Sequence, residues 1–177
     1  MPSSELVPVA PPLPEHIETP ALVIDLDVVE RNARRMAEQV AAHGLGLRPH
    51  IKTHKSVALA RIQLAAGAIG VTVGTLGEAE VMANGGVTDI LLAYPLWAEG
   101  SKAARLRALH ERANVQLIVG VDSVPAGQRL AAAVDGTRAP LRVLVELDPG
   151  YHRTGIDPAA AGELAEELRS LGLDVVG

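Results

Sequence analysis

The stretch LGLRPHIKTHKSVALARIQLAAGAIGVTVG, residues 45–74, decides the fold of this chain. Residues 45–52 have the pattern of a buried strand that ends in polar residues, residues 56–68 are rich in Ala and Leu, and residues 69–74 are β-branched again. A strand, a helix and a second strand in this order indicate a parallel βαβ unit, because parallel strands need a long crossover connection. The stretch therefore predicts a parallel sheet with a polar cluster where its strand ends.

The same alternation runs through the rest of the chain. Asp27 with Glu30 three residues later is typical of a capping box at the start of a helix, and Gly44 is placed to end that helix. Six helices are predicted at residues 27–44, 56–68, 76–86, 99–113, 124–136 and 157–172. Seven strands are predicted at residues 20–26, 45–52, 69–74, 89–96, 115–122, 140–148 and 173–177.

Strands that alternate with helices predict either a closed barrel or an open, doubly wound sheet. A dinucleotide-binding sheet needs G-x-G-x-x-G at its first turn, and no such pattern follows Leu26 or His50. We therefore predict an α/β fold, a parallel (β/α)8 TIM-type barrel. An eight-stranded barrel takes about 250 residues, so at 177 residues the barrel is expected to be incomplete.

Composition narrows the classes of function. With 48% hydrophobic residues the chain can bury a core, and 16 basic against 21 acidic residues give a formal charge of −5. This balance argues against nucleic-acid or anionic-membrane partners and favours a small-molecule substrate. No apolar run reaches the roughly 20 residues of a membrane span. The Pro-rich start lacks the regions of a secretory signal, so we expect a cytoplasmic protein.

A polar cluster, HIKTHKS, lies at the end of the strand predicted over residues 45–52. Period-two alternation predicts that Arg48, His50 and Lys52 line the barrel mouth together. Crowding by the cations Arg48 and Lys55 would favour an uncharged Lys52 amine, which is a nucleophile that forms Schiff bases with aldehydes. The alternative is that both lysines are ordinary exposed residues at a helix start, as most lysines are.

Two other groups of residues are candidates for a functional site. His50 and His54 are four apart, but the break between strand and helix spoils the geometry for a shared metal, so we predict no metal site in this chain. In ELDPGYHRTGID, glycines flank Arg153 and would let its guanidinium reach an anionic oxygen. A solvated arginine in a turn explains this segment equally well. Thr72, Thr75 and Tyr94 could offer hydroxyls, although turn and capping roles explain them as well, and Glu78 and Glu80 are expected to be helix-surface acids.

Together, TPALVIDLDVVERNARRM, LRPHIKTHK, GVTVGTLGEAEVMANGG, DILLAYPL and VLVELDPGYHRTGI resemble the D-threonine aldolase and D-serine dehydratase-like family. This family shares the pyridoxal-phosphate barrel of alanine racemase. The resemblance implies that Lys52 holds pyridoxal phosphate as a Schiff base and that Arg153 lies near the phenolic oxygen of the ring. His50, beside Lys52, is a further expected cofactor contact.

The resemblance also implies a domain plan. Residues 1–18 would be a Pro-rich arm, residues 19–45 an opening strand and helix, and residues 46–177 a partial barrel of about six strands. The strand at residues 20–26 would pair with a C-terminal β-domain that this chain lacks, and the ligands of a divalent metal would lie in that domain. The full-length protein could then be a homodimer.

The implied activity is a pyridoxal-phosphate-dependent lyase for D-β-hydroxy-α-amino acids, working by retro-aldol cleavage or by elimination. An amino-acid racemase and a non-catalytic pyridoxal-phosphate carrier are the alternatives. Because the barrel is open and the metal unsupported, the 177-residue chain alone is expected to be a poor catalyst.

Overall fold

The computed structural model describes residues 16–177, in which five parallel strands form one sheet in the order β1-β2-β3-β4-β5. A doubly wound sheet reverses its strand order at a switch point. Here each strand pairs with the next one along the chain, which is the order of a barrel. This confirms the predicted partial (β/α) barrel. The strands are β1 (Val71–Val73), β2 (Asp89–Leu92), β3 (Gln116–Val121), β4 (Arg142–Val145) and β5 (Asp174–Val175).

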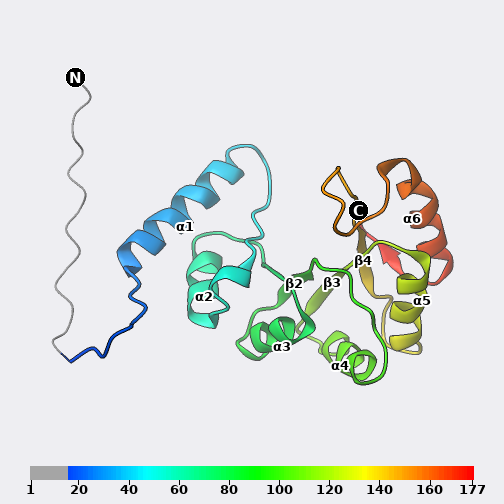
Figure 1. The fold of residues 1–177 in the computed structure, drawn as a ribbon, viewed down its shortest axis with the longest axis horizontal. Helices are drawn as coiled ribbons and strands as arrows, with labels where there is room; N and C mark the ends of the chain where they lie inside the picture. Colours follow the sequence, from blue (N-terminus) through cyan, green and yellow to red (C-terminus); the bar gives the residue numbers. More distant parts are fainter. Residues whose placement is uncertain (1–15) are drawn as a thin grey trace.

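All six predicted helices form in the described part of the chain, and Figure 1 shows α3 to α6 following the sheet in sequence order. Ser56 and Thr75 start two of them, because each side chain accepts a hydrogen bond from a free N–H of the first turn. Within residues 16–177, none of the helices combines the length and the apolar character that a membrane span requires. The helices are α1 (Leu26–Ala41), α2 (Val57–Ala65), α3 (Leu76–Asn84), α4 (Ser101–His110), α5 (Val124–Ala133) and α6 (Ala161–Ser170), with short 3-10 turns η1 (Ile51–Thr53) and η2 (Pro158–Ala160).

The core lies between the sheet and its helices. Strand register aligns one residue from each strand in a single row: Val73, Leu92, Val119, Val143 and Val175. The first four are buried, and they belong to one apolar cluster with fully buried leucines of α4, α5 and α6. Each such side chain contributes about 1.5–3 kcal/mol through removal of apolar surface from water. Aliphatic packing therefore suffices in a chain without Phe.

The strand predicted at residues 20–26 is wrong for this structure. Residues 21–25 have no regular structure, and the side chain of Leu22 is 91% exposed. The helix starts at Leu26 rather than at the predicted Asp27, because Asp25 accepts a hydrogen bond from the Val28 N–H at 3.1 Å. Within residues 16–177 no strand pairs with this segment, and an unpaired strand is not stable by itself. The predicted Pro-rich arm lies almost wholly outside the described residues.

The strand predicted over residues 45–52 is reduced to one bridging residue. His50 pairs in parallel with Thr72, and the chain then turns into η1, so Lys52 lies in a 3-10 turn and not on a strand. Pro49 has no N–H to offer a ladder, and the His50 side chain accepts a hydrogen bond from the Lys52 N–H, which favours the turn. Five strands and one bridge therefore replace the six predicted barrel strands.

The complete burial of Ile90 predicts a large loss of stability when its side chain is shortened. Ile90 is fully buried on β2, whereas the side chain of Ile69 is 54% exposed. Ile90→Ala should lower the free energy of unfolding by about 2–5 kcal/mol through the cavity that it leaves. Ile69→Ala is the matched control and should cost less than about 1 kcal/mol. Urea denaturation followed by circular dichroism measures both, and equal losses would contradict this assignment of the core.

Candidate active site

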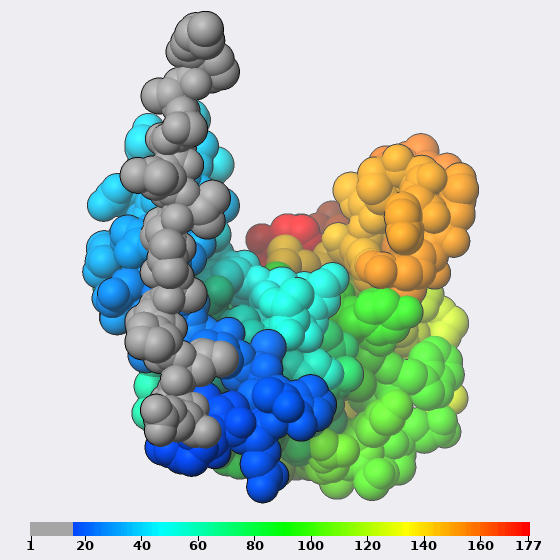
Figure 2. Space-filling model, turned by 60° about the vertical axis from the view of Figure 1, so that its left-hand side comes forward, coloured from blue at the N-terminus to red at the C-terminus, as the bar shows by residue number. Residues whose placement is uncertain are grey.

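The carboxyl ends of the strands meet at one edge of the sheet. His50 lies at the bridge beside β1, Gly74 follows β1, Tyr94 lies just beyond β2, Asp122 follows β3 and Glu146 follows β4. Parallel pairing brings these positions together, since neighbouring strands end at the same side. We call this edge the mouth. The space-filling view shows a hollow beside the segment from Asp148 to Asp157, which stands above the surface in orange (Figure 2).

Lys52 lies at the mouth directly after the bridge, and it is exposed. Its backbone N–H donates to His50 Nδ1 at 3.3 Å, which fixes the turn and leaves the side chain free. Among residues 16–177, no carboxylate forms an ion pair with Lys52. No carboxylate in this part of the chain therefore competes with a ligand for the Lys52 side chain.

The two cations expected to crowd Lys52 have partners of their own. Lys55 Nζ lies 3.0 Å from Glu78 Oε1. Arg48 pairs with Asp89, the first residue of β2, so its guanidinium reaches towards the opposite end of the sheet from the mouth. Gly70 permits this crossing, because a Cβ there would collide with the guanidinium. The prediction that Arg48 lines the mouth beside Lys52 was therefore wrong.

Glu78 is a member of the site that sequence reasoning missed. It was expected on a helix surface, but its Oε2 accepts a hydrogen bond from the Gly74 N–H at 2.8 Å, at the end of β1. Burial raises the pKa of Glu78, and this is outweighed by the Gly74 N–H and by Lys55, so the pKa falls below its usual value. The spacing Thr75-x-x-Glu78 is that of a capping box and could have revealed this return to the strand end.

Both histidines of HIKTHKS accept hydrogen bonds from backbone N–H groups of the turn. Burial lowers the pKa of His50, and the nearby charge of Lys52 lowers it further, so the neutral imidazole is favoured and can accept the Lys52 N–H. His54 uses both ring nitrogens, since Nδ1 accepts from the Ser56 N–H at 3.0 Å and Nε2 lies 3.3 Å from Gln63 Oε1. The pair thus shapes the backbone around Lys52.

Arg153 is placed by the loop between β4 and η2. Its guanidinium lies over the ring of Tyr94, 5.6 Å from the centroid, and over that of Tyr151, at 5.5 Å. Gly155 has a φ of +100°, and a Cβ there would lie 2.5 Å from the Leu147 carbonyl carbon, so the close approach requires glycine.

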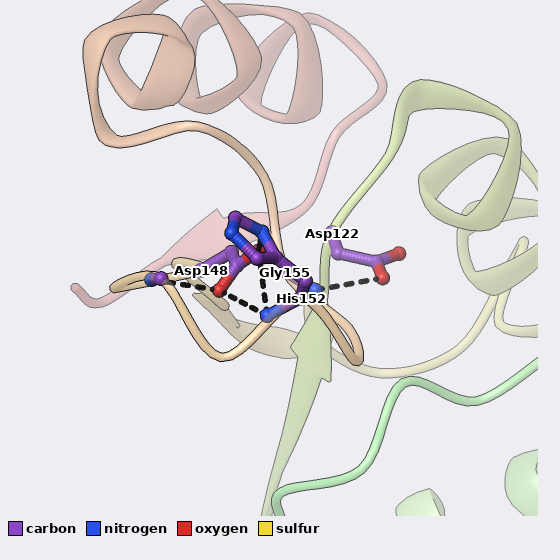
Figure 3. A network of polar contacts seen from close by, with 5 residues as sticks. Asp122, Asp148, His152 and Gly155 are labelled. Carbon is purple, nitrogen blue, oxygen red and sulfur yellow. Dashed lines mark hydrogen bonds and ion pairs between the residues drawn. The ribbon is translucent and has the colours of Figure 1, made fainter.

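Two hydrogen bonds pin this loop to the strand ends. The Gly155 N–H donates to Asp122 Oδ2 at 3.3 Å, and Thr154 Oγ1 donates to Glu146 Oε1 at 2.6 Å (Figure 3 shows the first). With the loop held in this way, the guanidinium of Arg153 contacts Tyr94, and Arg153 thus lies at the mouth. Of the other predicted hydroxyl donors, Thr72 bonds the Arg48 carbonyl and Thr75 caps α3, so both are structural.

Known proteins match most of the chain. The family model described as alanine racemase, N-terminal domain, matches residues 24–177. The D-threo-3-hydroxyaspartate dehydratase of Delftia sp. strain HT23 is 44% identical over 140 residues, which cover 79% of this chain and 36% of that protein. The 3-hydroxy-D-aspartate aldolase of Paracoccus denitrificans is 37% identical over 152 residues, covering 85% of this chain and 39% of that protein.

Solved structures agree with this assignment. The D-threonine aldolase of Filomicrobium marinum superposes with a TM-score of 0.78 at 36% identity, covering 85% of this chain and 40% of that one. The alanine racemase of Streptomyces lavendulae matches with a TM-score of 0.69 at 24% identity, which shows the fold alone. The chain spans about 36–40% of the length of these four proteins. It belongs to the family of the alanine racemase N-terminal domain.

Proposed function

We propose that this chain is the pyridoxal-phosphate-binding part of a lyase that acts on D-β-hydroxy-α-amino acids. The observation that carries the proposal is Lys52, an exposed amine at the mouth without an ion-pair partner in the described chain, while neighbouring Lys55 is held by Glu78. Relatives named as lyases for such substrates are 35–44% identical to the chain. Structures of alanine racemases match at only 20–24% identity, which favours the lyase over the racemase.

The side chains present fit pyridoxal phosphate. Lys52 offers an amine for the aldehyde, and the guanidinium of Arg153 offers a cation for the phenolic oxygen. His50 would sit behind Lys52 as a neutral imidazole. Arg153 lies over two aromatic rings and, within residues 16–177, has no carboxylate partner that an anionic oxygen would need to displace.

Each residue then has a defined task. When bound, the cofactor supplies an aldehyde for amines and an electron sink for the pair left on a substrate carbon. Lys52 would hold the cofactor through that aldehyde until a substrate amine takes its place. Glu78 keeps Lys55 occupied, so that Lys52 is the amine presented at the mouth. One solved structure of a D-threo-3-hydroxyaspartate dehydratase is described as its metal-free form, and a divalent metal in the whole protein would be bound by residues outside this chain.

Reductive trapping tests the anchor. The full chain mixed with pyridoxal phosphate and reduced with borohydride should carry the label on Lys52, located by peptide mass spectrometry. Lys52→Ala should abolish the label, and Lys55→Ala, the matched control, should retain it. Label on Lys55 in the unaltered chain, or none on a chain shown to be folded, would refute the proposal.

Affinity for the cofactor tests Arg153. Arg153→Ala should weaken pyridoxal-phosphate binding about tenfold, or about 1.4 kcal/mol, through loss of one ionic contact. Arg129 is the matched control, since its guanidinium also lies over an aromatic ring, 4.3 Å from the centroid of Trp97, but on α5. Arg129→Ala should leave the affinity unchanged. Absorbance titration measures both constants, and equal losses would remove Arg153 from the site.

Turnover distinguishes the reaction classes. The whole protein of which this chain is part, loaded with pyridoxal phosphate and a divalent metal, should act on D-threo-3-hydroxyaspartate or D-threonine and release an aldehyde or ammonia, and a chelator should abolish this reaction by removing the Lewis acid. Aldehyde and ammonia assays, with D-alanine as a substrate lacking the hydroxyl, make the measurement. Racemisation of D-alanine without lyase products would instead support the racemase.

A further inference from the structure

The guanidinium of Arg153 contacts two aromatic rings at the mouth. Its carbon atom lies 5.6 Å from the centroid of the Tyr94 ring and 5.5 Å from that of the Tyr151 ring. Both distances are within the roughly 6 Å over which the face of an aromatic ring attracts a cation. Tyr94 lies just beyond β2, whereas Tyr151 is on the same loop as Arg153, after β4. The Tyr94 contact therefore connects this loop to the end of another strand, and the Tyr151 contact stays within the loop.

The backbone around Tyr94 is fixed to the sheet. The N–H of the preceding residue, Ala93, donates a hydrogen bond to the Val73 carbonyl of β1 at 3.1 Å. The following residue, Pro95, also restricts Tyr94, because a proline ring disfavours the α conformation in the residue before it. Tyr94 is nevertheless 47% exposed, so part of its side chain is accessible at the mouth. The Tyr94 ring thus stands on a backbone that is held in place on both sides.

Arg153, in contrast, is an exposed residue on a loop. The hydrogen bonds of Thr154 and Gly155 hold the loop backbone, but they do not restrict the long arginine side chain. Within residues 16–177 no carboxylate forms an ion pair with its guanidinium. A ring face attracts a cation without supplying an opposite net charge. Contact with Tyr94 therefore orients the guanidinium and leaves its charge available for an anionic oxygen.

We propose that Tyr94 is a positioning residue, whose ring holds the guanidinium of Arg153 in the orientation that binds the phenolic oxygen of pyridoxal phosphate. The inference rests on the proposed function, and it gives a task to the ring of Tyr94 rather than to its hydroxyl. Ordering a flexible side chain before the ligand arrives lowers the entropic cost of binding. Tyr94 therefore acts on cofactor affinity through Arg153 and does not need to touch the cofactor itself.

Chemical modification tests the contact in the full chain without cofactor. Phenylglyoxal should modify Arg153 about two- to fivefold faster in the Tyr94→Leu chain, as expected when one exposed cation–π contact is lost. Tyr94→Phe keeps the ring and should retain the slower rate. Arg129, which lies over Trp97, is the internal control, and its rate should be the same in all three chains. Peptide mass spectrometry reads both arginines. An unchanged rate at Arg153 in the Tyr94→Leu chain would overturn the inference.

A double-mutant cycle tests whether Tyr94 acts through Arg153. In absorbance titrations of the full chain with pyridoxal phosphate, Tyr94→Leu should raise Kd about threefold. Tyr94→Phe should leave Kd unchanged. In the Arg153→Ala chain, Tyr94→Leu should have no further effect, because the side chain that the ring positions is absent. Trp97→Leu is the matched control, since Trp97 is 46% exposed and its ring also contacts an arginine, and it should leave Kd unchanged.

The outcomes separate this inference from the proposed function. Borohydride labelling of Lys52 in the Tyr94→Leu chain shows that the site is folded and loaded. If that label is present and Tyr94→Leu leaves Kd unchanged, or raises it equally with and without Arg153, the inference fails although the lyase assignment stands. A loss of affinity in Tyr94→Phe as large as that in Tyr94→Leu would overturn the inference as well, because it would assign the effect to the hydroxyl. Absence of the Lys52 label in the unaltered chain would refute both.

Discussion

The parallel pairing of β1 to β5 is the constraint on which the rest of the structure depends. Because all five strands run parallel, every strand-to-helix connection leaves the sheet at the same edge. Lys52, Glu78 and Arg153 are far apart in sequence, yet all three are attached to that edge by short connections. The row of buried residues from Val73 to Val143 fixes the register, and a shift by one residue would turn these side chains away from the helices.

Charge pairing around the motif then decides which amine is available. Three cations lie within eight residues, and each of two has a carboxylate partner, Asp89 for Arg48 and Glu78 for Lys55. Ion pairs that reach solvent, as the 63% exposed Lys55 side chain does, contribute little to stability, about 0–1 kcal/mol each. Their importance here is that they occupy Arg48 and Lys55 and so leave Lys52 as the amine presented at the mouth. The motif is basic in sequence, but its charges are largely compensated in space.

Local patterns predicted most of the fold because helices and buried strands have periodic signals. All six helices and strands β1 to β5 were found near their expected positions. The predictions were wrong for segments whose structure depends on the residues with which they pair. The segment at residues 20–26 has strand-forming residues, but within the described chain no neighbouring strand accepts its hydrogen bonds. The strand leading to Lys52 stops at His50, because Pro49 and the His50 side chain favour a turn that period-two alternation does not reveal.

In the candidate site, too, local sequence patterns predicted some features, whereas others depend on contacts between residues far apart in the sequence. The motif predicted Lys52 at the mouth because side chains alternate along a strand. This reason is partly wrong, since the strand ends before Lys52 and Arg48 pairs with Asp89 at the other end of the sheet. The role of Glu78 depends on Gly74 and Lys55, and it becomes visible only when the capping box and the strand end are considered together. The pairing of Asp148 with His152 needs a positive φ at a residue other than glycine, which sequence patterns do not predict. Strain of this kind persists only where the surroundings enforce it. Here the surroundings are the hydrogen bonds of Asp148 and the anchors at Asp122 and Glu146, so the conformation of this loop follows from the same sheet edge that presents Lys52.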